Sequence, residues 1–175
     1  MKALFLVLAL VCLVPPSLAA QTRDPNDHFF QATFRDLPEE LALAKSEGKL
    51  GLAIMFEAED CPPCKRMKRD ILSQVRVQDY YRKHFRVISI DFNGDQEVVD
   101  TAGKTWTEKR FAGKEGIGIR GTPSFLFLDL QGREMSRQYG EIRSVDAFMK
   151  LGEFVVSGAW RKGDFRAYLE KTGTK

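Results

Sequence analysis

The chain has 175 residues, of which 43% are hydrophobic and 29% are charged, and these values are typical of one folded domain rather than of a disordered chain. Its 27 Lys and Arg residues exceed its 24 Asp and Glu residues by a net charge of only +3, which is too small an excess to indicate a nucleic-acid-binding protein. Three Cys and two His residues are too few for a miniprotein held together by disulfide bonds or for a His-rich metal site.

Residues 1–19 have the parts of a secretory signal peptide. A lysine gives a positively charged start, an apolar run covers residues 3–14, and two prolines end that run. Small residues follow, so we expect cleavage near Ala19 or Ala20. The apolar run is shorter than the roughly 20 residues that a membrane-spanning helix needs. Cys12 lies inside this segment, where lipid attachment is the alternative to its removal with the signal. We expect export to the periplasm, an oxidising compartment in which cysteines form disulfide bonds.

Residues 20–47 are predicted to form a helical segment that packs on the domain. Apolar residues recur there at helical spacing, and we expect Phe29, Phe30 and Phe34 to lie in the core. Asp36 is a capping residue with a proline two positions later, as at the start of many helices.

The rest of the chain alternates between strands and helices. We expect strands over residues 50–56, 86–91, 124–130 and 133–139. We expect helices after the strand at 50–56 and over residues 75–84, 107–114, 144–156 and 164–171, with a small hairpin within 93–106. Because a strand–helix–strand unit pairs its strands in parallel and a short turn pairs them antiparallel, the order predicts an α/β fold with a mixed sheet flanked by helices.

Two cysteines, Cys61 and Cys64, stand at the predicted start of a helix that directly follows the first apolar strand. The positive end of the helix dipole and the free amides of its first turn stabilise a thiolate there. Pro62 and Pro63 remove two of these amides, so we expect Cys64 and Lys65 to donate the remaining hydrogen bonds. Cys61 is first and more exposed, so it is the predicted nucleophile, and Cys64, one turn inside, is the predicted resolving thiol.

Three interpretations of this cysteine pair remain. Half of a zinc site would need further ligands such as His28 and His84, which do not form a ligand-like pair. An inert structural disulfide would have a short spacer that favours strain and reduction. A redox-active dithiol fits the strand-then-helix context, and we therefore predict that interpretation, with no metal and no cofactor.

Two segments carry a resemblance to the thioredoxin family. The first is residues 50–65, which ends in Cys-Pro-Pro-Cys-Lys, and the second is residues 120–127, which contains Gly-Thr-Pro. The resemblance covers a thioredoxin-like domain at residues 48–158, with an inserted hairpin and helix segment and a C-terminal tail helix at residues 159–175. It implies that Pro123 is cis and packs against the cysteine pair, and that Thr122 presents its backbone to the substrate. A trans proline that merely starts a strand is the alternative.

The sequence departs from thioredoxins next to the cysteines. Asp60 replaces the tryptophan that precedes the first cysteine in thioredoxins, and Met55 replaces a buried aspartate. Glu57 lies on the same strand face as Met55 and closer to the cysteines, so we hypothesise that Glu57 accepts the proton of Cys64. An exposed carboxylate at a loop entrance is the alternative.

Acidic residues also bear on the redox potential and on substrates. Acids beside Cys61 disfavour its thiolate, so we expect a potential of roughly −270 mV rather than −120 mV. We assign Asp60 and Pro62, which flank Cys61, to the substrate-binding surface together with Thr122 and Pro123.

The export signal, the inserted segment and the acidic pair before Cys61 make the chain similar to periplasmic thioredoxins of the sulfur-oxidation and cytochrome c maturation type. This resemblance implies a thiol–disulfide oxidoreductase that reduces specific exported proteins and receives electrons from an inner-membrane thiol carrier. We expect a monomer that binds no nucleic acid. A disulfide oxidase or isomerase, and a thioredoxin-like adaptor or metal-binding module without catalysis, are the alternatives.

Overall fold

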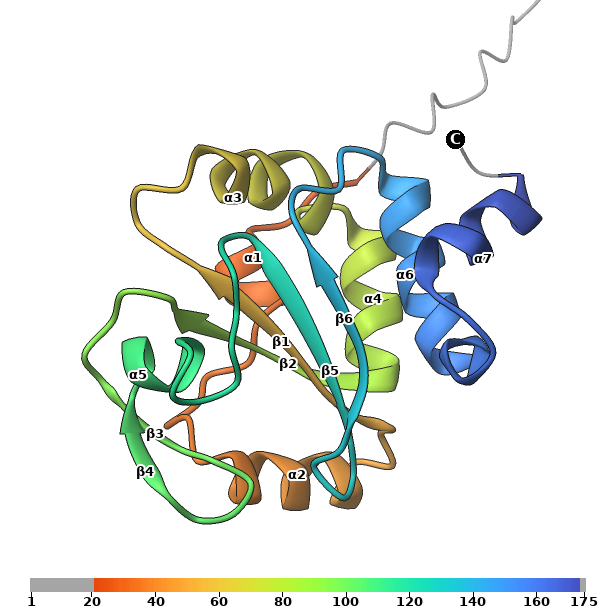
Figure 1. Cartoon of the computed structure of the whole chain (residues 1–175). Coiled ribbons are helices and arrows are strands. Elements are labelled where there is room, and N and C mark those ends of the chain that lie inside the picture. Colours follow the sequence, from red (N-terminus) through yellow and green to blue (C-terminus); the bar gives the residue numbers. More distant parts are fainter. Residues whose placement is uncertain (1–20, 174–175) are drawn as a thin grey trace, which may run out of the picture.

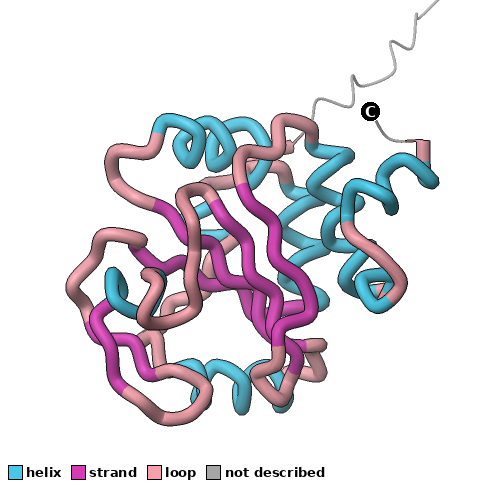
Figure 2. Tube along the Cα trace, viewed as in Figure 1, coloured by secondary structure: helices cyan, strands magenta, loops and turns pink. Residues whose placement is uncertain are grey.

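A four-stranded mixed sheet lies at the centre of the structure, a computed structural model that describes residues 21–173 (Figures 1 and 2). The predicted signal peptide lies outside the described residues. The strands of this sheet are β1 (Gly51–Glu57), β2 (Phe85–Asp91), β5 (Ser124–Asp129) and β6 (Glu134–Tyr139). Their order is β2-β1-β5-β6, in which β1 is parallel to β2 and antiparallel to β5, and β5 is antiparallel to β6. The predicted mixed sheet is confirmed.

Helices and a second, small sheet surround these strands. The α-helices are α1 (Pro25–His28), α2 (Leu37–Ser46), α3 (Pro62–Met67), α4 (Val75–His84), α5 (Glu108–Ala112), α6 (Val145–Val156) and α7 (Phe165–Thr172). A π-helical turn, η1 (Lys68–Leu72), continues α3, and a 3-10 turn, η2 (Ala159–Arg161), follows α6. The inserted hairpin consists of β3 (Glu97–Val99) and β4 (Thr105–Thr107), which pair antiparallel. Helices α4 and α6 lie on one side of the sheet, and α2, α5 and the hairpin lie on the other (Figure 1).

The alternating side chains of β1 divide the core into two clusters. Ala53 and Met55 belong to a cluster with residues of α3, α4 and α6, and this cluster includes both cysteines. Leu52, Ile54 and Phe56 belong to a cluster on the opposite face, with residues of α2 and α5. A strand covered on both faces is expected to be a continuous apolar run, and all of its residues except the last are buried.

The N-terminal segment is only partly helical. Helix α1 ends at His28 and α2 begins at Leu37, after Asp36, whose side chain accepts a hydrogen bond from the Glu39 amide at 2.9 Å. Between them the chain bonds to the edge of β2, where the Gln31 amide donates to the Val87 carbonyl at 2.8 Å.

The prediction that Phe34 lies in the core is therefore wrong. Its neighbours Phe29 and Phe30 are buried, whereas Phe34 is 90% exposed. Pairing with the open edge of β2 satisfies backbone groups that a continuous helix would have satisfied internally, and this pairing overrides the helical spacing of the apolar residues.

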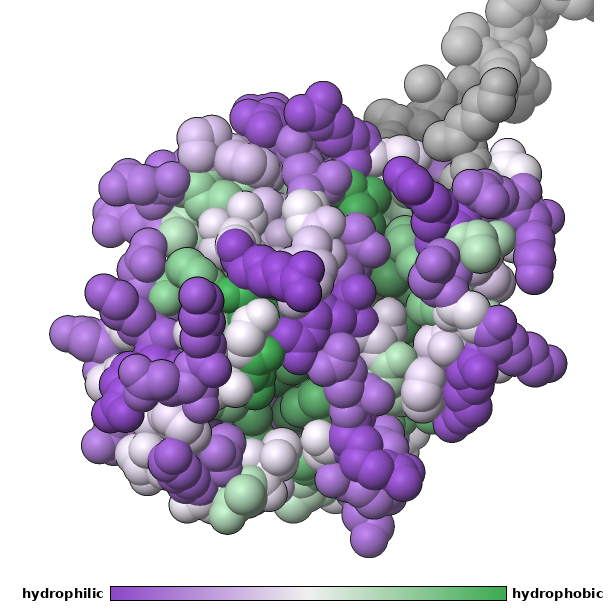
Figure 3. All heavy atoms as spheres, viewed as in Figure 1, coloured by the Kyte–Doolittle hydropathy of each residue, from purple (hydrophilic) through white to green (hydrophobic). Residues whose placement is uncertain are grey.

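The surface seen in Figure 3 is mainly hydrophilic, with hydrophobic residues visible in a hollow. A pocket of about 250 Å³ on the side of the sheet that carries α2, α5 and the hairpin has Phe111, Ile117 and Leu126 among its lining residues. At the other side, α7 packs on α6 through Phe165 and Tyr168, whose rings lie 5.7 and 5.3 Å from the ring of Phe154. No helix within residues 21–173 is long and apolar enough to cross a membrane.

Candidate active site

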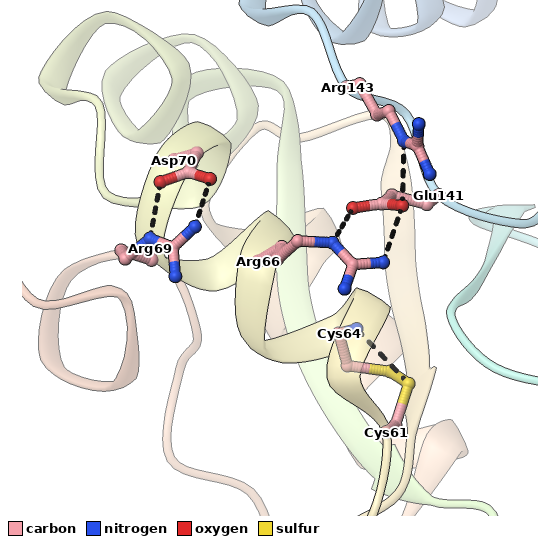
Figure 4. A network of polar contacts seen from close by, with 7 residues as sticks. All are labelled: Cys61, Cys64, Arg66, Arg69, Asp70, Glu141 and Arg143. Atoms are coloured by element: carbon pink, nitrogen blue, oxygen red, sulfur yellow. Dashed lines mark hydrogen bonds and ion pairs between the residues drawn. A yellow bond between two sulfur atoms is a disulfide. The ribbon is translucent and has the colours of Figure 1, made fainter.

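Cys61 and Cys64 form a disulfide bond at the start of α3 (Figure 4). Their sulfur atoms are 2.01 Å apart and their Cα atoms 5.2 Å apart. Strand β1 ends at Glu57, a turn follows, and Cys61 in extended conformation caps the helix. Cys61 is 5% exposed and Cys64 only 1%, so both residues are buried and Cys61 is the slightly more exposed one. A thiol–disulfide exchange partner would therefore meet Cys61 first.

The cap of α3 involves the sulfur itself. The Cys64 amide donates to Cys61 Sγ over 3.2 Å, as predicted, but the Lys65 amide donates to the Cys61 carbonyl at 3.1 Å and not to the sulfur. Because Pro62 and Pro63 have no N–H, the cysteine sulfur receives one backbone hydrogen bond in this first turn. The expectation of two amide donors to the sulfur is wrong because the Lys65 amide makes the regular i to i−4 helical hydrogen bond to the Cys61 carbonyl.

The residues that flank Cys61 are open to solvent. Glu59 and Asp60 form an exposed turn before it, and Pro62 is exposed after it. These positions are accessible to a bound protein, and the assignment of Asp60 and Pro62 to substrate binding stays a prediction.

Glu57 lies at the end of β1 and on the wall of the same pocket as Cys64. Lys68 donates hydrogen bonds to its two carboxylate oxygens, at 2.8 Å to Oε1 and 2.7 Å to Oε2, and the Ser89 hydroxyl donates to Oε1. The pocket has a volume of about 310 Å³ and also contains Asp91. Glu57 is thus an anchored, partly buried carboxylate that lines the same pocket as Cys64 and not a free carboxylate at a loop entrance.

Thr122 and Pro123 precede β5, and the peptide bond between them is cis. Ser124, the next residue, pairs with Phe56 of β1, so Pro123 lies at the end of the sheet where the chain leaves β1 for Cys61. Pro123 is buried, and its carbonyl accepts a hydrogen bond from the Gly140 amide at 2.9 Å. The topology brings the cysteine pair and the Thr122–Pro123 bond to the same end of the sheet. The role of Thr122 and Pro123 in binding a substrate backbone stays a prediction.

An ion-pair clamp beside the disulfide was not predicted from the sequence. Arg66 of α3 donates to both carboxylate oxygens of Glu141, at 2.7 and 3.0 Å, and Arg143 donates to the same carboxylate at 3.0 Å (Figure 4). Glu141 belongs to the loop between β6 and α6, so the clamp fastens the active-site helix to that loop. The hydrogen bond from Arg66 is the main cause that lowers the pKa of Glu141 to about 2, and Arg143 adds to it.

The clamp predicts how Glu141 affects acid stability. A carboxylate whose pKa is lowered in the folded state stabilises the fold above its unfolded value near 4.5, and this contribution is lost as the pH falls toward about 2. We expect Glu141→Gln to be less stable than the parent at neutral pH, with the difference shrinking below about pH 4.5 and absent near pH 2. Urea unfolding followed by circular dichroism across this range measures the difference. Glu97→Gln, at an exposed carboxylate of β3, is the control, and parallel pH curves for the parent and Glu141→Gln would contradict the prediction.

Sequence reasoning missed two further residues near the cysteines. Lys68 stands four positions after Cys64 and therefore on the same side of the helix, a spacing that can be read from the sequence. Ser89 has no such local signal, because only the parallel pairing of β1 with β2 brings it to Glu57. Within residues 21–173, no group of three or more His, Cys, Asp and Glu side chains is placed so that it could hold a metal ion.

Comparisons with known proteins agree with this geometry. The model of the family described as thioredoxin-like domain matches residues 37–156. No curated protein matches the sequence.

Several solved structures are similar to this one. A thioredoxin-fold protein from Helicobacter pylori has 18% identity and a TM-score of 0.61, and the match covers 83% of this chain and 92% of that one. A thioredoxin from Thermus thermophilus has 26% identity and a TM-score of 0.56, and the match covers 73% of this chain and 90% of that one. The DsbH oxidoreductase has 18% identity and a TM-score of 0.55, and the match covers 82% of this chain and 95% of that one.

Proposed function

This chain belongs to the thioredoxin-like family and is a thiol–disulfide oxidoreductase, and from that premise we propose that it is an exported reductase of specific protein disulfides. The observation that carries the proposal is the Cys61–Cys64 disulfide at the N-terminus of α3, in which Cys61 is the more exposed residue. Its likeness to a thioredoxin from Thermus thermophilus at 26% identity supports dithiol chemistry.

The proposed reaction starts from the reduced dithiol. The Cys61 thiolate attacks one sulfur of a substrate disulfide, forms a mixed disulfide and displaces the second substrate sulfur, which takes up a proton. Cys64 then loses its proton and attacks Cys61 Sγ. This closes the disulfide seen in the structure and displaces the first substrate sulfur. Two electrons thus pass from the chain to the substrate, together with one proton from Cys64 and one from solvent.

Glu57 is the proposed proton acceptor for Cys64. It lies on the wall of the pocket that Cys64 also lines, and two side chains hold its carboxylate in place. In thioredoxins a buried aspartate stands where this chain has Met55, which is fully buried among apolar residues and cannot accept a proton. Glu57 supplies a carboxylate two residues nearer to the cysteines.

Reduction rather than oxidation is proposed because of the charges around Cys61. The exposed acids Glu59 and Asp60 disfavour its thiolate, and its sulfur accepts one backbone hydrogen bond. A less stabilised thiolate makes the dithiol a better reductant. On the basis of the signal-like segment we propose export to the periplasm, where an inner-membrane thiol carrier would regenerate the dithiol. We propose that the chain acts as a monomer on protein substrates whose backbone binds at Thr122 and Pro123.

The reduction potential tests the direction of electron flow. The mature chain is equilibrated in glutathione buffers at pH 7, its free thiols are alkylated, and the two forms are quantified by mass spectrometry. We expect roughly −270 mV, the value of a reducing thioredoxin. A potential near −120 mV would contradict the proposal and indicate an oxidase.

A further inference from the structure

Lys68 contacts the proposed proton acceptor more closely than any other charged side chain among the described residues. Its ammonium group binds both oxygens of Glu57, and it also lies 3.3 Å from the amide oxygen of Asn26 and 5.3 Å from the ring centroid of Phe30. These contacts leave its side chain 24% exposed. The ammonium is held at a defined place by groups from β1 and α1.

The backbone at Lys68 is also unusual. It is the first residue of the π-helical turn η1, and its carbonyl accepts a hydrogen bond from the Ser73 amide at 3.0 Å. Such turns are rare and often occur at functional sites. The hydrogen bonding therefore changes from α-helical to π-helical directly after α3, at Lys68, the residue that binds Glu57.

Cys64, Glu57 and Lys68 line one pocket. Other charged residues line the two pockets that Lys68 also lines: Arg23 and Asp24 before α1, Glu59 after β1, Lys65 and Arg69 on the same helical stretch, and Asp91 at the end of β2. Lys65, the other cation on the wall of this pocket, is exposed and makes no ion pair with Glu57.

The proposed release step moves one negative charge within this pocket. Before the step the charge lies on the Glu57 carboxylate, and after proton transfer it lies on the Cys64 sulfur. A fixed cation on the wall that Glu57 and Cys64 share compensates a negative charge on either group, and without it the pocket keeps only the exposed Lys65. The step itself needs no further reactant, because the proton of Cys64 goes to Glu57 and then to the departing substrate thiolate.

We propose that Lys68 is a positioning residue for the second step of the reaction, in which Cys64 attacks the mixed disulfide and releases the substrate thiol. It holds the Glu57 carboxylate toward Cys64 and compensates the charge that moves to the Cys64 sulfur. This inference rests on the proposed role of Glu57 as proton acceptor. It assigns to Lys68, four positions after Cys64, a part in the release of the substrate thiol.

The test measures the rate at which the substrate thiol is released from the mixed disulfide with Cys61. The reduced chain is mixed with a chromogenic aromatic disulfide in a stopped-flow instrument, where the first thiol released reports attack by Cys61 and the second reports resolution by Cys64. The variants are Lys68→Met, Lys68→Arg, Glu57→Gln and the matched control Lys65→Met, each over pH 5 to 9. Circular dichroism melts and the rate of the first phase report whether each variant keeps its fold and its active-site helix.

We expect Lys68→Met to slow the second phase about tenfold at neutral pH, the effect of losing one charge-assisted hydrogen bond. The rate of the first phase should stay within about twofold of the parent. Lys68→Arg should restore most of the second-phase rate because it keeps the positive charge. Lys65→Met should show the second-phase rate of the parent. These results would support the role of Lys68.

Three results would overturn the proposal, and they distinguish a failure of Lys68 from a failure of Glu57. If Glu57→Gln slows release but Lys68→Met does not, or if Lys68→Arg is as slow as Lys68→Met, Glu57 remains the acceptor and the role of Lys68 is wrong. If Glu57→Gln releases at the parent rate at every pH, the proposed proton acceptor itself is wrong and the inference about Lys68 fails with it.

Discussion

Replacing Cys64 with serine will leave the chain covalently attached to its substrates through Cys61. The disulfide pairs these two residues, and Cys61 is the more exposed of them. Without the second thiol, a mixed disulfide formed by Cys61 has no neighbouring sulfur to displace the substrate. Affinity purification of Cys64→Ser from cells that express it, without reductant and followed by mass spectrometry, should recover discrete adducts that dithiothreitol removes.

The matched variant Cys61→Ser should form no such adducts. We expect its catalysed disulfide reduction to fall to background, a loss of at least about 10³-fold, because the proposed nucleophile is gone and Cys64 is the more buried of the two cysteines. The double variant Cys61→Ser/Cys64→Ser sets the background of nonspecific capture. Adducts at Cys64 in Cys61→Ser, in amounts equal to those at Cys61 in Cys64→Ser, would contradict the assigned order of attack.

Much of the sheet can be predicted from the sequence because its signals are local. Strand β1 is a run of apolar residues of strand length, and a strand buried on both faces needs such a run. Helix α2 begins directly after Asp36, whose side chain makes the capping hydrogen bond. In each case the residues that define the element are neighbours in the chain.

The features that the sequence does not predict depend on distant pairing. Arg66 and Glu141 are 75 residues apart, and no spacing rule connects a helix residue with a loop on the far side of β6. Phe34 keeps helical spacing with Phe30, yet the edge of β2 draws this segment out of the helix. Lys68 is an intermediate case, since its spacing from Cys64 is local while its partner Glu57 is reached only after β1 and α3 have packed together.

Tyr81 is expected to be among the most important residues for stability. Its ring is fully buried in α4, lies parallel to Phe148 of α6 with centroids 4.6 Å apart, and contacts Phe29 at 5.7 Å. Its hydroxyl donates to the Phe148 carbonyl at 2.7 Å. Tyr81→Ala would open a cavity between α4, α6 and the cluster that contains the cysteines, so we expect a loss of about 3–5 kcal/mol in the free energy of unfolding, measured by urea denaturation.

Tyr81→Phe separates the hydrogen bond from the packing. It keeps the stacked ring and removes the hydroxyl, so we expect a loss of only about 1 kcal/mol at neutral pH. Burial raises the pKa of Tyr81 well above its ordinary value of 10, whereas the unfolded chain ionises near 10. Stability contributed by the neutral phenol is therefore present below pH 10 and is lost as the pH rises further, and Tyr81→Phe should lose less stability in that range than the parent. Equal losses for Tyr81→Ala and Tyr81→Phe would mean that the hydrogen bond and not the buried ring holds α4 to α6.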